Sequence, residues 1–323
     1  MKTIQYLIIA SLLCFTAQPL TVYAAESDDS EFNYIMKQVT DKIHVIFGPL
    51  ELPDSKNHGF RNNVIIVTTS KGIVLMDPGG SAWAGEMVAS KIKETFDMPI
   101  AAVFDSHAHG DHWLGNEGIK RHYPNAVIYG HPNMKARLEG NDGPFWLETI
   151  NRITENTADG KHVVAPDKIV NDGDVITVGD TNFRIIHTGK AHTDNDIMIE
   201  IVGENALFTG DVVRNRFLGI MEDDSSFKGN IAAIDKIAAM KFEYYIPGHG
   251  SVGAVGMALA YKSYLASLRD AVKELYDEGM SDYEMKPQVI TALSDFNSWT
   301  GFELRLGAHI SRVYLEIEKD EFE

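Results

Sequence analysis

The sequence predicts an α/β fold in which two β-sheets form a sandwich covered by helices on both outer faces. The chain has two halves, and each half begins with short β-type runs and ends in helical patterns. Elements in this order bury their apolar faces by packing sheet on sheet, with helices outside. Low-complexity linkers do not separate the halves, and 323 residues suit one large domain.

The first half is predicted to mix strands and helices. The expected strands are Ile43–Phe47, Val64–Thr68, Ile73–Met76, Ile100–Phe104 and Ala126–Tyr129, and the expected helices are Ala82–Phe96 and residues 144–157. Asp77-Pro78-Gly79-Gly80 predicts a turn after the third strand. Trp146, at helical spacing in the second helix, is expected to pack against the core.

The second half repeats this order. The expected strands are Asp174–Val178, Asn182–His187, Ile197–Val202, Ala206–Thr209 and Tyr244–Ile246, and the expected helices are Ile231–Met240, Met257–Glu278 and Phe302–Lys319. The last two helices are a C-terminal extension. They are expected either to cover the sandwich or to provide a substrate wall or a partner surface.

Residues 1–24 have the pattern of a secretory signal peptide. Lys2 precedes a short apolar stretch, and the small residues Val22 and Ala24 predict cleavage after Ala24. The stretch is too short for a transmembrane anchor, and the sequence has no other stretch that is long and apolar enough to span a bilayer. We therefore expect residues 25–323 to be one exported domain, periplasmic or secreted.

Charge and cysteine content narrow the partners and the ligands. The formal net charge is −17, and removal of residues 1–24 with Lys2 would leave −18. This charge repels phosphate backbones, which argues against nucleic acid and leaves a small-molecule substrate. Cys14 is the only cysteine and would leave with the signal peptide, so metal ligands would be nitrogen and oxygen atoms. The sequence does not predict an oligomeric state.

The hexapeptide His107-Ala108-His109-Gly110-Asp111-His112 follows the strand predicted at Ile100–Phe104. Its first two histidines are expected to point to one place, and Asp111 and His112, beyond the glycine, to a second place nearby. Imidazole nitrogen and carboxylate oxygen are ligands that suit zinc. A single histidine is more often a structural residue, but this cluster predicts two metal ions close together.

Three further polar residues follow predicted strands and have glycine nearby, which lets the backbone approach a crowded site. His192 lies in Thr188-Gly189-Lys190-Ala191-His192-Thr193, Asp211 in Thr209-Gly210-Asp211, and His249 in Pro247-Gly248-His249-Gly250. A two-metal site needs more than the four ligands of the hexapeptide. We therefore expect these three residues to complete it.

This set of motifs, from Ile43 to Gly250, resembles that of the metallo-β-lactamase-fold hydrolase superfamily. Asp77-Pro78-Gly79 also matches the strand-end turn of that family. The resemblance implies an αββα sandwich of two mixed β-sheets with the site at one edge. It also implies a metallo-hydrolase with two Zn²⁺ ions, iron or manganese being the alternative metals.

The resemblance also implies a role for each ligand. His107, His109 and His192 would hold the first metal, Asp111, His112 and His249 the second, and Asp211 would bridge the two. Metal-bound water is acidic enough to be hydroxide near pH 7, and the metal polarises a carbonyl. We expect hydroxide to attack an acyl carbonyl directly, with Asp111 as the catalytic residue that orients the nucleophile and relays its proton.

The substrate is less well defined. Members that resemble this chain open β-lactams, lactones and thioesters. Export favours β-lactams and disfavours the glutathione thioester of a glyoxalase II-like enzyme, whereas dedicated metallo-β-lactamases usually have Cys or Ser in place of Asp211. The alternatives are an iron-dependent sulfur dioxygenase, which usually works with one iron, and a non-catalytic metal-binding module, which usually lacks some ligands.

Candidate substrate contacts flank the metal motifs. His58 and Phe60, with Arg61, belong to the loop between two early strands, which is expected either to contact the substrate or to be a solvated hairpin tip. Trp113 follows the hexapeptide and is expected either to line a pocket or to pack beneath it.

Two arginines follow Asp211 in a chain with few basic residues. Arg214 and Arg216 are expected either to bind a substrate carboxylate by bidentate hydrogen bonds or to pair with the acidic residues Glu222, Asp223 and Asp224.

Overall fold

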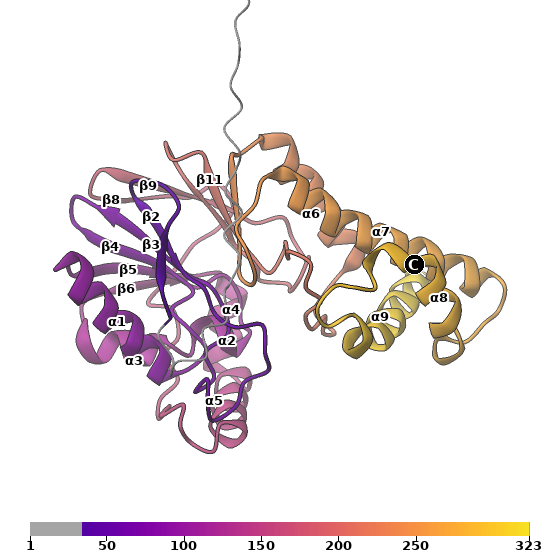
Figure 1. Cartoon of the computed structure of the whole chain (residues 1–323), viewed down its shortest axis with the longest axis horizontal. Helices are drawn as coiled ribbons and strands as arrows, with labels where there is room; N and C mark the ends of the chain where they lie inside the picture. Colours follow the sequence, from indigo (N-terminus) through magenta and orange to yellow (C-terminus); the bar gives the residue numbers. More distant parts are fainter. Residues whose placement is uncertain (1–33, 323) are drawn as a thin grey trace, which may run out of the picture.

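The computed structural model describes residues 34–322 (Figure 1). The predicted signal peptide, with Cys14, lies outside the described residues. Two β-sheets lie face to face, and helices cover the outer face of each sheet. The predicted αββα fold is therefore confirmed. Within residues 34–322, no helix is long and apolar enough to cross a membrane.

The first sheet has the strand order β1-β2-β3-β4-β5-β6-β7. Pairing is antiparallel from β1 to β4 and parallel from β4 to β7, so the sheet is mixed. Its strands are β1 (Met36–Gln38), β2 (Ile43–Ile46), β3 (Val64–Thr69), β4 (Gly72–Met76), β5 (Ile100–Phe104), β6 (Val127–Gly130) and β7 (Lys168–Ile169). Because β4 and β5 are parallel, the residues that follow them emerge at the same edge.

The second sheet has the order β12-β11-β10-β9-β8. Only β11 and β12 pair in parallel, and the other pairs are antiparallel, so this sheet is mixed as well. Its strands are β8 (Val175–Val178), β9 (Thr181–Ile186), β10 (Met198–Ile201), β11 (Ala206–Gly210) and β12 (Tyr244–Pro247). The parallel pair again brings two strand ends to one edge.

The side chains of β3 show how the sequence builds the layers. Successive side chains of a strand point to opposite faces of its sheet. Ile65 and Val67 belong to the apolar core between the sheets, and Val64 and Ile66 belong to the core beneath the outer helices. All four are fully buried, which agrees with the continuous apolar run in the sequence.

Helices α1 (Ala82–Phe96) and α3 (Asn116–His122) cover the first sheet, and α6 (Phe227–Met240) covers the second. The start of α1 is fixed because the Ser81 side chain accepts a hydrogen bond from the backbone N–H of Ala84 at 3.0 Å. Its bounds are those predicted from the sequence.

The remaining helices lie beside and beyond the sandwich. They are α2 (Gly110–Trp113), α4 (Pro132–Glu139), α5 (Asp142–Ile153), α7 (Val255–Asp277), α8 (Lys286–Ala292) and α9 (Phe302–Phe322), with short 3₁₀ turns at Asp282–Glu284 and Ser294–Phe296. Figure 1 shows α7, α8 and α9 as an arm that extends away from the sheets. One apolar cluster joins this arm to α6 and the second sheet, through residues such as Leu207, Ile234, Leu268 and Leu306.

Helix bounds differ from the prediction where local backbone features set them. The helix α6 begins at Phe227 because the Ser226 side chain caps it, four residues before the apolar periodicity begins. The helix α5 ends at Ile153, short of the predicted end, and Glu155 and Asn156 then have φ of 54° and 64°, which a right-handed helix excludes. The sequence does not predict β1, β7, α3, α4 or α8, because elements this short carry little periodicity.

Candidate metal centre

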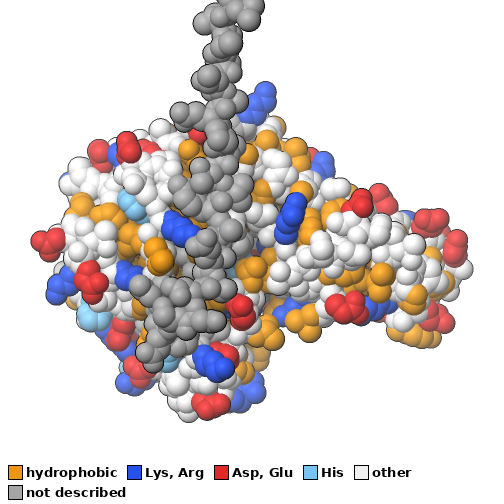
Figure 2. All heavy atoms as spheres, in the orientation of Figure 1, with side chains coloured by type: hydrophobic (Ala, Val, Ile, Leu, Met, Phe, Trp, Pro, Cys, Tyr) orange, Lys and Arg blue, Asp and Glu red, His pale blue; other side chains and the backbone are white. Residues whose placement is uncertain are grey.

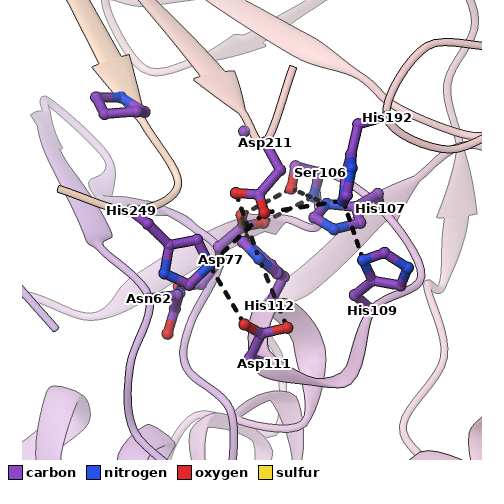
Figure 3. Close-up of polar contacts among 12 residues, drawn as sticks. Asn62, Asp77, Ser106, His107, His109, Asp111, His112, His192, Asp211 and His249 are labelled. Atoms are coloured by element: carbon purple, nitrogen blue, oxygen red, sulfur yellow. Dashed lines mark hydrogen bonds and ion pairs between the residues drawn. The ribbon is translucent and has the colours of Figure 1, made fainter. Parts of the chain in front are cut away.

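The polar residues singled out in the sequence meet at one edge of the sandwich (Figure 3). The hexapeptide follows β5, and the other ligands follow β9, β11 and β12. Seven side chains offer ligand atoms there, and we refer to them as the seven-residue cluster: His107, His109, Asp111, His112, His192, Asp211 and His249. The structure therefore brings together every residue predicted as a metal ligand.

His107, His109 and His192 form one group within the seven-residue cluster. Their ligand atoms lie within 4.8 Å of one another. The Nδ1 atom of His109 is 3.0 Å from the Nε2 atom of His192, and the His107 ring stands nearly perpendicular to both. All three side chains are buried. Three ring nitrogens that converge in this way match one face of a tetrahedral zinc site.

Asp111, His112 and His249 form the second group. The Nε2 atom of His249 lies 3.3 Å from Oδ2 of Asp111, and Nε2 of His112 lies 3.7 Å from Oδ1 of Asp111. This group combines two imidazoles with one carboxylate. The first two histidines of the hexapeptide thus belong to one group, and Asp111 and His112 belong to the other, as the sequence predicts.

Asp211 lies between the two groups (Figure 3). Its Oδ1 atom is 3.7 Å from Nε2 of His112, and its Oδ2 atom is 3.7 Å from Nε2 of His249. The same Oδ2 atom is 3.8 Å from Nε2 of His192, in the other group. One carboxylate therefore faces ligands of both groups, which is the position of a bridging ligand.

Several ligand atoms of the seven-residue cluster are buried without a hydrogen-bond partner among the described residues. They include Nε2 of His107, Nε2 of His112 and Oδ1 of Asp211. An unsatisfied buried polar atom costs about 1–3 kcal/mol, so three at one place require an explanation. Nitrogen and oxygen atoms that lack protein partners and face one another fit bound zinc ions.

Asp77 orients two of these histidines from behind. Its Oδ2 atom lies 2.6 Å from Nδ1 of His112 and accepts a hydrogen bond from the Ser106 hydroxyl at 2.7 Å. Because that hydroxyl donates to Asp77, it accepts from Nδ1 of His107 at 2.9 Å. Both imidazoles therefore carry a proton on Nδ1 and turn Nε2 toward the site.

The loop after β12 is fixed by the first sheet. Nδ1 of His249 donates to the backbone carbonyl of Arg61 at 3.1 Å, and the Asn63 side chain donates to the carbonyls of Pro247 and Gly250. A Cβ atom on Gly248 would lie 2.4 Å from Oδ1 of Asp211. Glycine is therefore required here, because the backbone itself packs against the cluster.

Electrostatics favour the ligand forms of most of these groups. Burial, with nearby cations, holds the pKa of His107 and of His192 well below the usual range. Burial raises the pKa of Asp111 and of Asp211, but neighbouring histidines and arginines outweigh it and hold both well below the usual range. Burial lowers the pKa of His112, but the surrounding carboxylates outweigh it and raise that pKa to about 9. Metal binding must therefore displace a proton from His112.

Comparison with known proteins identifies the family. The family model described as the metallo-beta-lactamase superfamily matches residues 59–249, which are more than half of the chain and include the whole seven-residue cluster. The chain belongs to the metallo-beta-lactamase superfamily. The resemblance seen in the sequence motifs is thereby confirmed.

Curated relatives share part of the chain's sequence. A hydroxyacylglutathione hydrolase from Francisella tularensis subsp. novicida is 26% identical over 230 residues, which cover 69% of this chain and 77% of that protein. A lactamase-like protein from Emericella nidulans is 27% identical over 192 residues, which cover 59% of this chain and 51% of that protein. These relatives support a metallo-hydrolase.

Solved structures of the superfamily share the fold. A metallo-beta-lactamase from Pontibacter korlensis superimposes with a TM-score of 0.58 at 18% identity, over 72% of this chain and 98% of that one. An inverting sec-alkylsulfatase from a Pseudomonas species gives a TM-score of 0.67 at 16% identity, over 87% of this chain and 50% of that one. At these identities the likeness shows the fold alone.

A cavity of about 230 Å³ opens beside the seven-residue cluster in this superfamily member. Four cluster residues line it, namely His109, Asp111, Asp211 and His249. Its other walls are apolar, with Leu52, Trp146, Ile150, Ile153 and Phe217, or cationic, with Arg61, Arg214 and Arg305. This combination suits an organic molecule that places one group near the cluster.

His58, Phe60 and Trp113, predicted as substrate contacts, do not line this cavity. Phe60 is fully buried in the core beneath the outer helices. Trp113 is also fully buried, and its Nε1 donates to the carbonyl of Ala108 at 3.0 Å, so it packs beneath the hexapeptide. His58 stacks on Trp83, with 4.2 Å between ring centroids. Burial removes Phe60 and Trp113 as substrate contacts, and stacking directs His58 elsewhere.

Arg214 pairs with a member of the seven-residue cluster. Its Nη2 and Nε atoms donate to Oδ2 of Asp211 at 2.7 Å and 3.3 Å. It is only 2% exposed, so its charge balances the buried carboxylate, and its partner is not one of residues 222–224. Arg216 is exposed and does not line the cavity.

Other residues of the site have little signal in the sequence. Trp146 is more than a packing residue, because it lines the cavity with its ring 5.7 Å from that of His109. Glu222 lies with Oε2 3.5 Å from Nε2 of His109. Arg305 comes from α9, far along the chain. Asp77 is the exception, because a carboxylate at the end of a strand beside the hexapeptide can be recognised in the sequence as a candidate to support a ligand.

Proposed function

We propose that this chain is an exported hydrolase that holds two zinc ions in the seven-residue cluster and attacks the acyl carbonyl of a small molecule. The observation that carries the proposal is the convergence of buried, unpaired ligand atoms, among them Nε2 of His107, Nε2 of His112 and Oδ1 of Asp211. His107, His109 and His192 would hold one ion, Asp111, His112 and His249 the other, and Asp211 would contact both.

Bound zinc would supply acidified water and a Lewis acid for the carbonyl oxygen. The chain itself contributes Asp111, whose side chain is 20% exposed whereas His112 and His249 are 0% and 2% exposed. Asp111 lines the cavity, and its low pKa keeps it ionised. Its carboxylate oxygens can therefore accept hydrogen bonds from the attacking water, orient it, and pass on the proton that it releases.

An acyl substrate is supported by the relatives and by the cavity. The name of the Francisella relative states that it hydrolyses a hydroxyacylglutathione, which makes a thioester the first class to test, with lactones and β-lactams next. The apolar wall around Trp146 and Ile150 suits a carbon-rich substrate. The formal charge of −17 argues against a nucleic-acid phosphodiester.

Export is proposed from residues 1–24, whose pattern is that of a signal peptide. Expression of the full chain in a Gram-negative host, followed by cell fractionation and N-terminal sequencing, tests it. The expected product is periplasmic or secreted and begins at Ala25. Cytosolic protein that keeps Met1 would contradict export and leave the hydrolase proposal intact.

The alternative on this scaffold is an iron-dependent sulfur dioxygenase. That activity usually works with one iron, whereas the chain presents two groups of ligands that share Asp211. The arrangement therefore favours hydrolysis. A non-catalytic module is disfavoured, because all seven ligand side chains are present and converge.

A hydrolysis panel on purified protein tests the proposed function. The panel contains a thioester, an acyl-homoserine lactone, nitrocefin and an aryl phosphodiester, each with and without a chelator, together with metal analysis of the protein. We expect chelator-sensitive cleavage of an acyl substrate and about two zinc ions per chain. Preferential phosphodiester cleavage, or one iron with oxygen uptake, would contradict the proposal.

A further inference from the structure

The cavity wall carries more positive charge than its own carboxylates balance. Arg61, Arg214 and Arg305 line it, and the acidic residues that line it are Asp111 and Asp211. Both carboxylates belong to the seven-residue cluster, and Asp211 is already paired with Arg214. In contrast, Figure 2 shows acidic side chains at the outer edge of the sandwich and at the far end of the helical arm.

Arg305 has a charge that no carboxylate of the described residues pairs with. No ion pair joins its guanidinium to a carboxylate of residues 34–322, and the side chain is only partly exposed. Burial, followed by the neighbouring charges of Arg61 and Arg214, lowers its pKa. An arginine stays charged even so. The guanidinium is therefore held near two others of the same sign, which is unfavourable unless an anion joins them.

Arg61 points into the same cavity. It is 8% exposed, its Nε atom is buried without a hydrogen bond among the described residues, and its ion pair with Oδ2 of Asp111 is long, at 3.7 Å. Its guanidinium lies over the ring of Phe217, 5.7 Å from the centroid. Stacking fixes the plane of the group and leaves N–H donors for a ligand.

The start of α9 is fixed to the loop that follows Asp211. The N–H of Leu218 donates to the carbonyl of Thr300 at 2.8 Å, and the N–H of Thr300 donates to the carbonyl of Arg216 at 3.0 Å. Gly301 has φ +83°, and a Cβ atom there would lie 2.5 Å from the carbonyl oxygen of Leu218. The backbone that carries Arg305 therefore packs directly against the loop.

His309 fixes the next turn of α9. Its Nε2 donates to the carbonyl of Gly219 at 2.9 Å, so its Nδ1 accepts from the Tyr264 hydroxyl at 2.8 Å. Residues four apart share one face of a helix, so Arg305 lies on the same face as His309. Gly219 lines the cavity. The helical arm thus holds Arg305 in a defined position at the cavity wall.

We propose that Arg61 and Arg305 together bind a carboxylate of the substrate, so that the chain acts on acyl compounds that carry an acidic group beside an apolar portion. The two guanidinium groups supply planar N–H donors that match a carboxylate. Trp146, Ile150 and Ile153 provide the apolar contacts across the same cavity. This inference rests on the proposed function for the acyl group of the substrate, whereas binding of a carboxylate can be measured without turnover.

Binding of a carboxylate and its neutral amide tests the subsite directly. The probes are 4-phenylbutyrate and 4-phenylbutanamide, titrated calorimetrically into the zinc-loaded protein and into chelator-treated protein. The variant Arg305→Met should weaken binding of the carboxylate about tenfold or more in both forms and leave the amide within about twofold. Arg305→Lys should recover part of the loss. The matched control is Arg312→Met, on the same helix but paired with Asp223 outside the cavity.

Turnover of two thioesters provides the second readout. S-acetyl-4-mercaptobenzoate carries a carboxylate where S-acetyl-4-mercaptobenzamide carries a neutral amide, and the two are otherwise the same. We expect Arg305→Met to raise KM for the first about tenfold, with kcat little changed, and to leave the second unaffected. Equal effects on both thioesters, or carboxylate binding that Arg305→Met does not weaken, would overturn the subsite. If neither the wild type nor any variant cleaves either thioester, but Arg305→Met still weakens carboxylate binding, the result would count against the acyl hydrolase and support the subsite.

Discussion

The seven-residue cluster and the cavity wall beside it differ in how completely neighbouring protein groups pair with their polar atoms. In the cluster, Nδ1 of His107, His112 and His249 each bonds a fixed neighbour, and among the described residues Nε2 of His107 and of His112 stays unpaired. In the wall, Arg61 retains a buried Nε without a hydrogen bond among the described residues, and Arg305 has no carboxylate beside it there.

The cluster and the wall show how one scaffold keeps the residues for chemistry apart from those for substrate recognition. The cluster stands on strand ends of both sheets, where the backbone is rigid and a displaced ligand would disturb the core. The wall is assembled from a loop, from α5 and from the C-terminal arm. Changes in those segments leave the strand ends in place, so substrate choice can vary while the metal ligands are kept.

The largest effect is expected from Asp111→Asn, which breaks the chemistry without emptying the cluster. Asparagine keeps the shape but cannot take up a proton, so kcat should fall about 100-fold or more. Most of the zinc should remain, because the other six ligands are unchanged. Steady-state kinetics with metal analysis measures both, with Asp41→Asn on the exposed turn before β2 as the control. Near-normal turnover in Asp111→Asn would defeat the assignment.

Asp77→Asn tests whether the support behind the cluster matters as much as the ligands. The neutral amide lacks the negative charge of the carboxylate that accepts from His112 and Ser106, so the orientation of two imidazoles weakens. Zinc affinity should fall about 10–100-fold. Competition with a coloured chelator measures it. An unchanged affinity would mean that the ligands position themselves without this residue.

His309→Leu perturbs the wall and should leave the cluster alone. The change strips partners from the buried hydroxyl of Tyr264 and the carbonyl of Gly219. Unfolding free energy should fall by about 2 kcal/mol, measured by urea denaturation. Zinc content should stay at the wild-type value. Loss of zinc in this variant would show that the two regions are not separable.

The smallest effect concerns Asp196, which accepts two hydrogen bonds from Thr193 at 2.7 Å in the turn after His192. Burial raises its pKa to about 7. From about pH 4 to 7 the folded chain thus keeps a proton that the unfolded chain releases, and this contribution to stability declines as the pH rises. Asp196→Asn should remove the decline.

Urea denaturation in the presence of chelator, at a series of pH values, measures the Asp196 contribution. The difference in unfolding free energy between Asp196→Asn and wild type should shift in favour of the variant as the pH rises. Asp194→Asn, a partly exposed neighbour, is the control. A difference that does not change between pH 4 and 7 would contradict the raised pKa.

The sequence predicts the seven-residue cluster better than it predicts the cavity wall. Most strands and the ligands are predictable, because the continuous apolar run of β3 and the hexapeptide after β5 are local patterns. Phe60 is misassigned as a substrate contact, and Trp113 takes the packing alternative, because a sequence does not show which face of a loop turns inward. Arg305 is not predictable at all, since its place depends on how α9 packs against a loop that lies some 80 residues earlier in the chain.

Zinc titration of the chelator-treated protein shows how many ions the seven-residue cluster holds. Isothermal calorimetry counts the ions that bind, and repeated runs in buffers of different ionisation enthalpy count the protons that His112 and its neighbours release. The structure leads us to expect two zinc ions per chain with net proton release near neutral pH. A single zinc ion, or none, at saturation would contradict a two-metal centre built from these seven side chains.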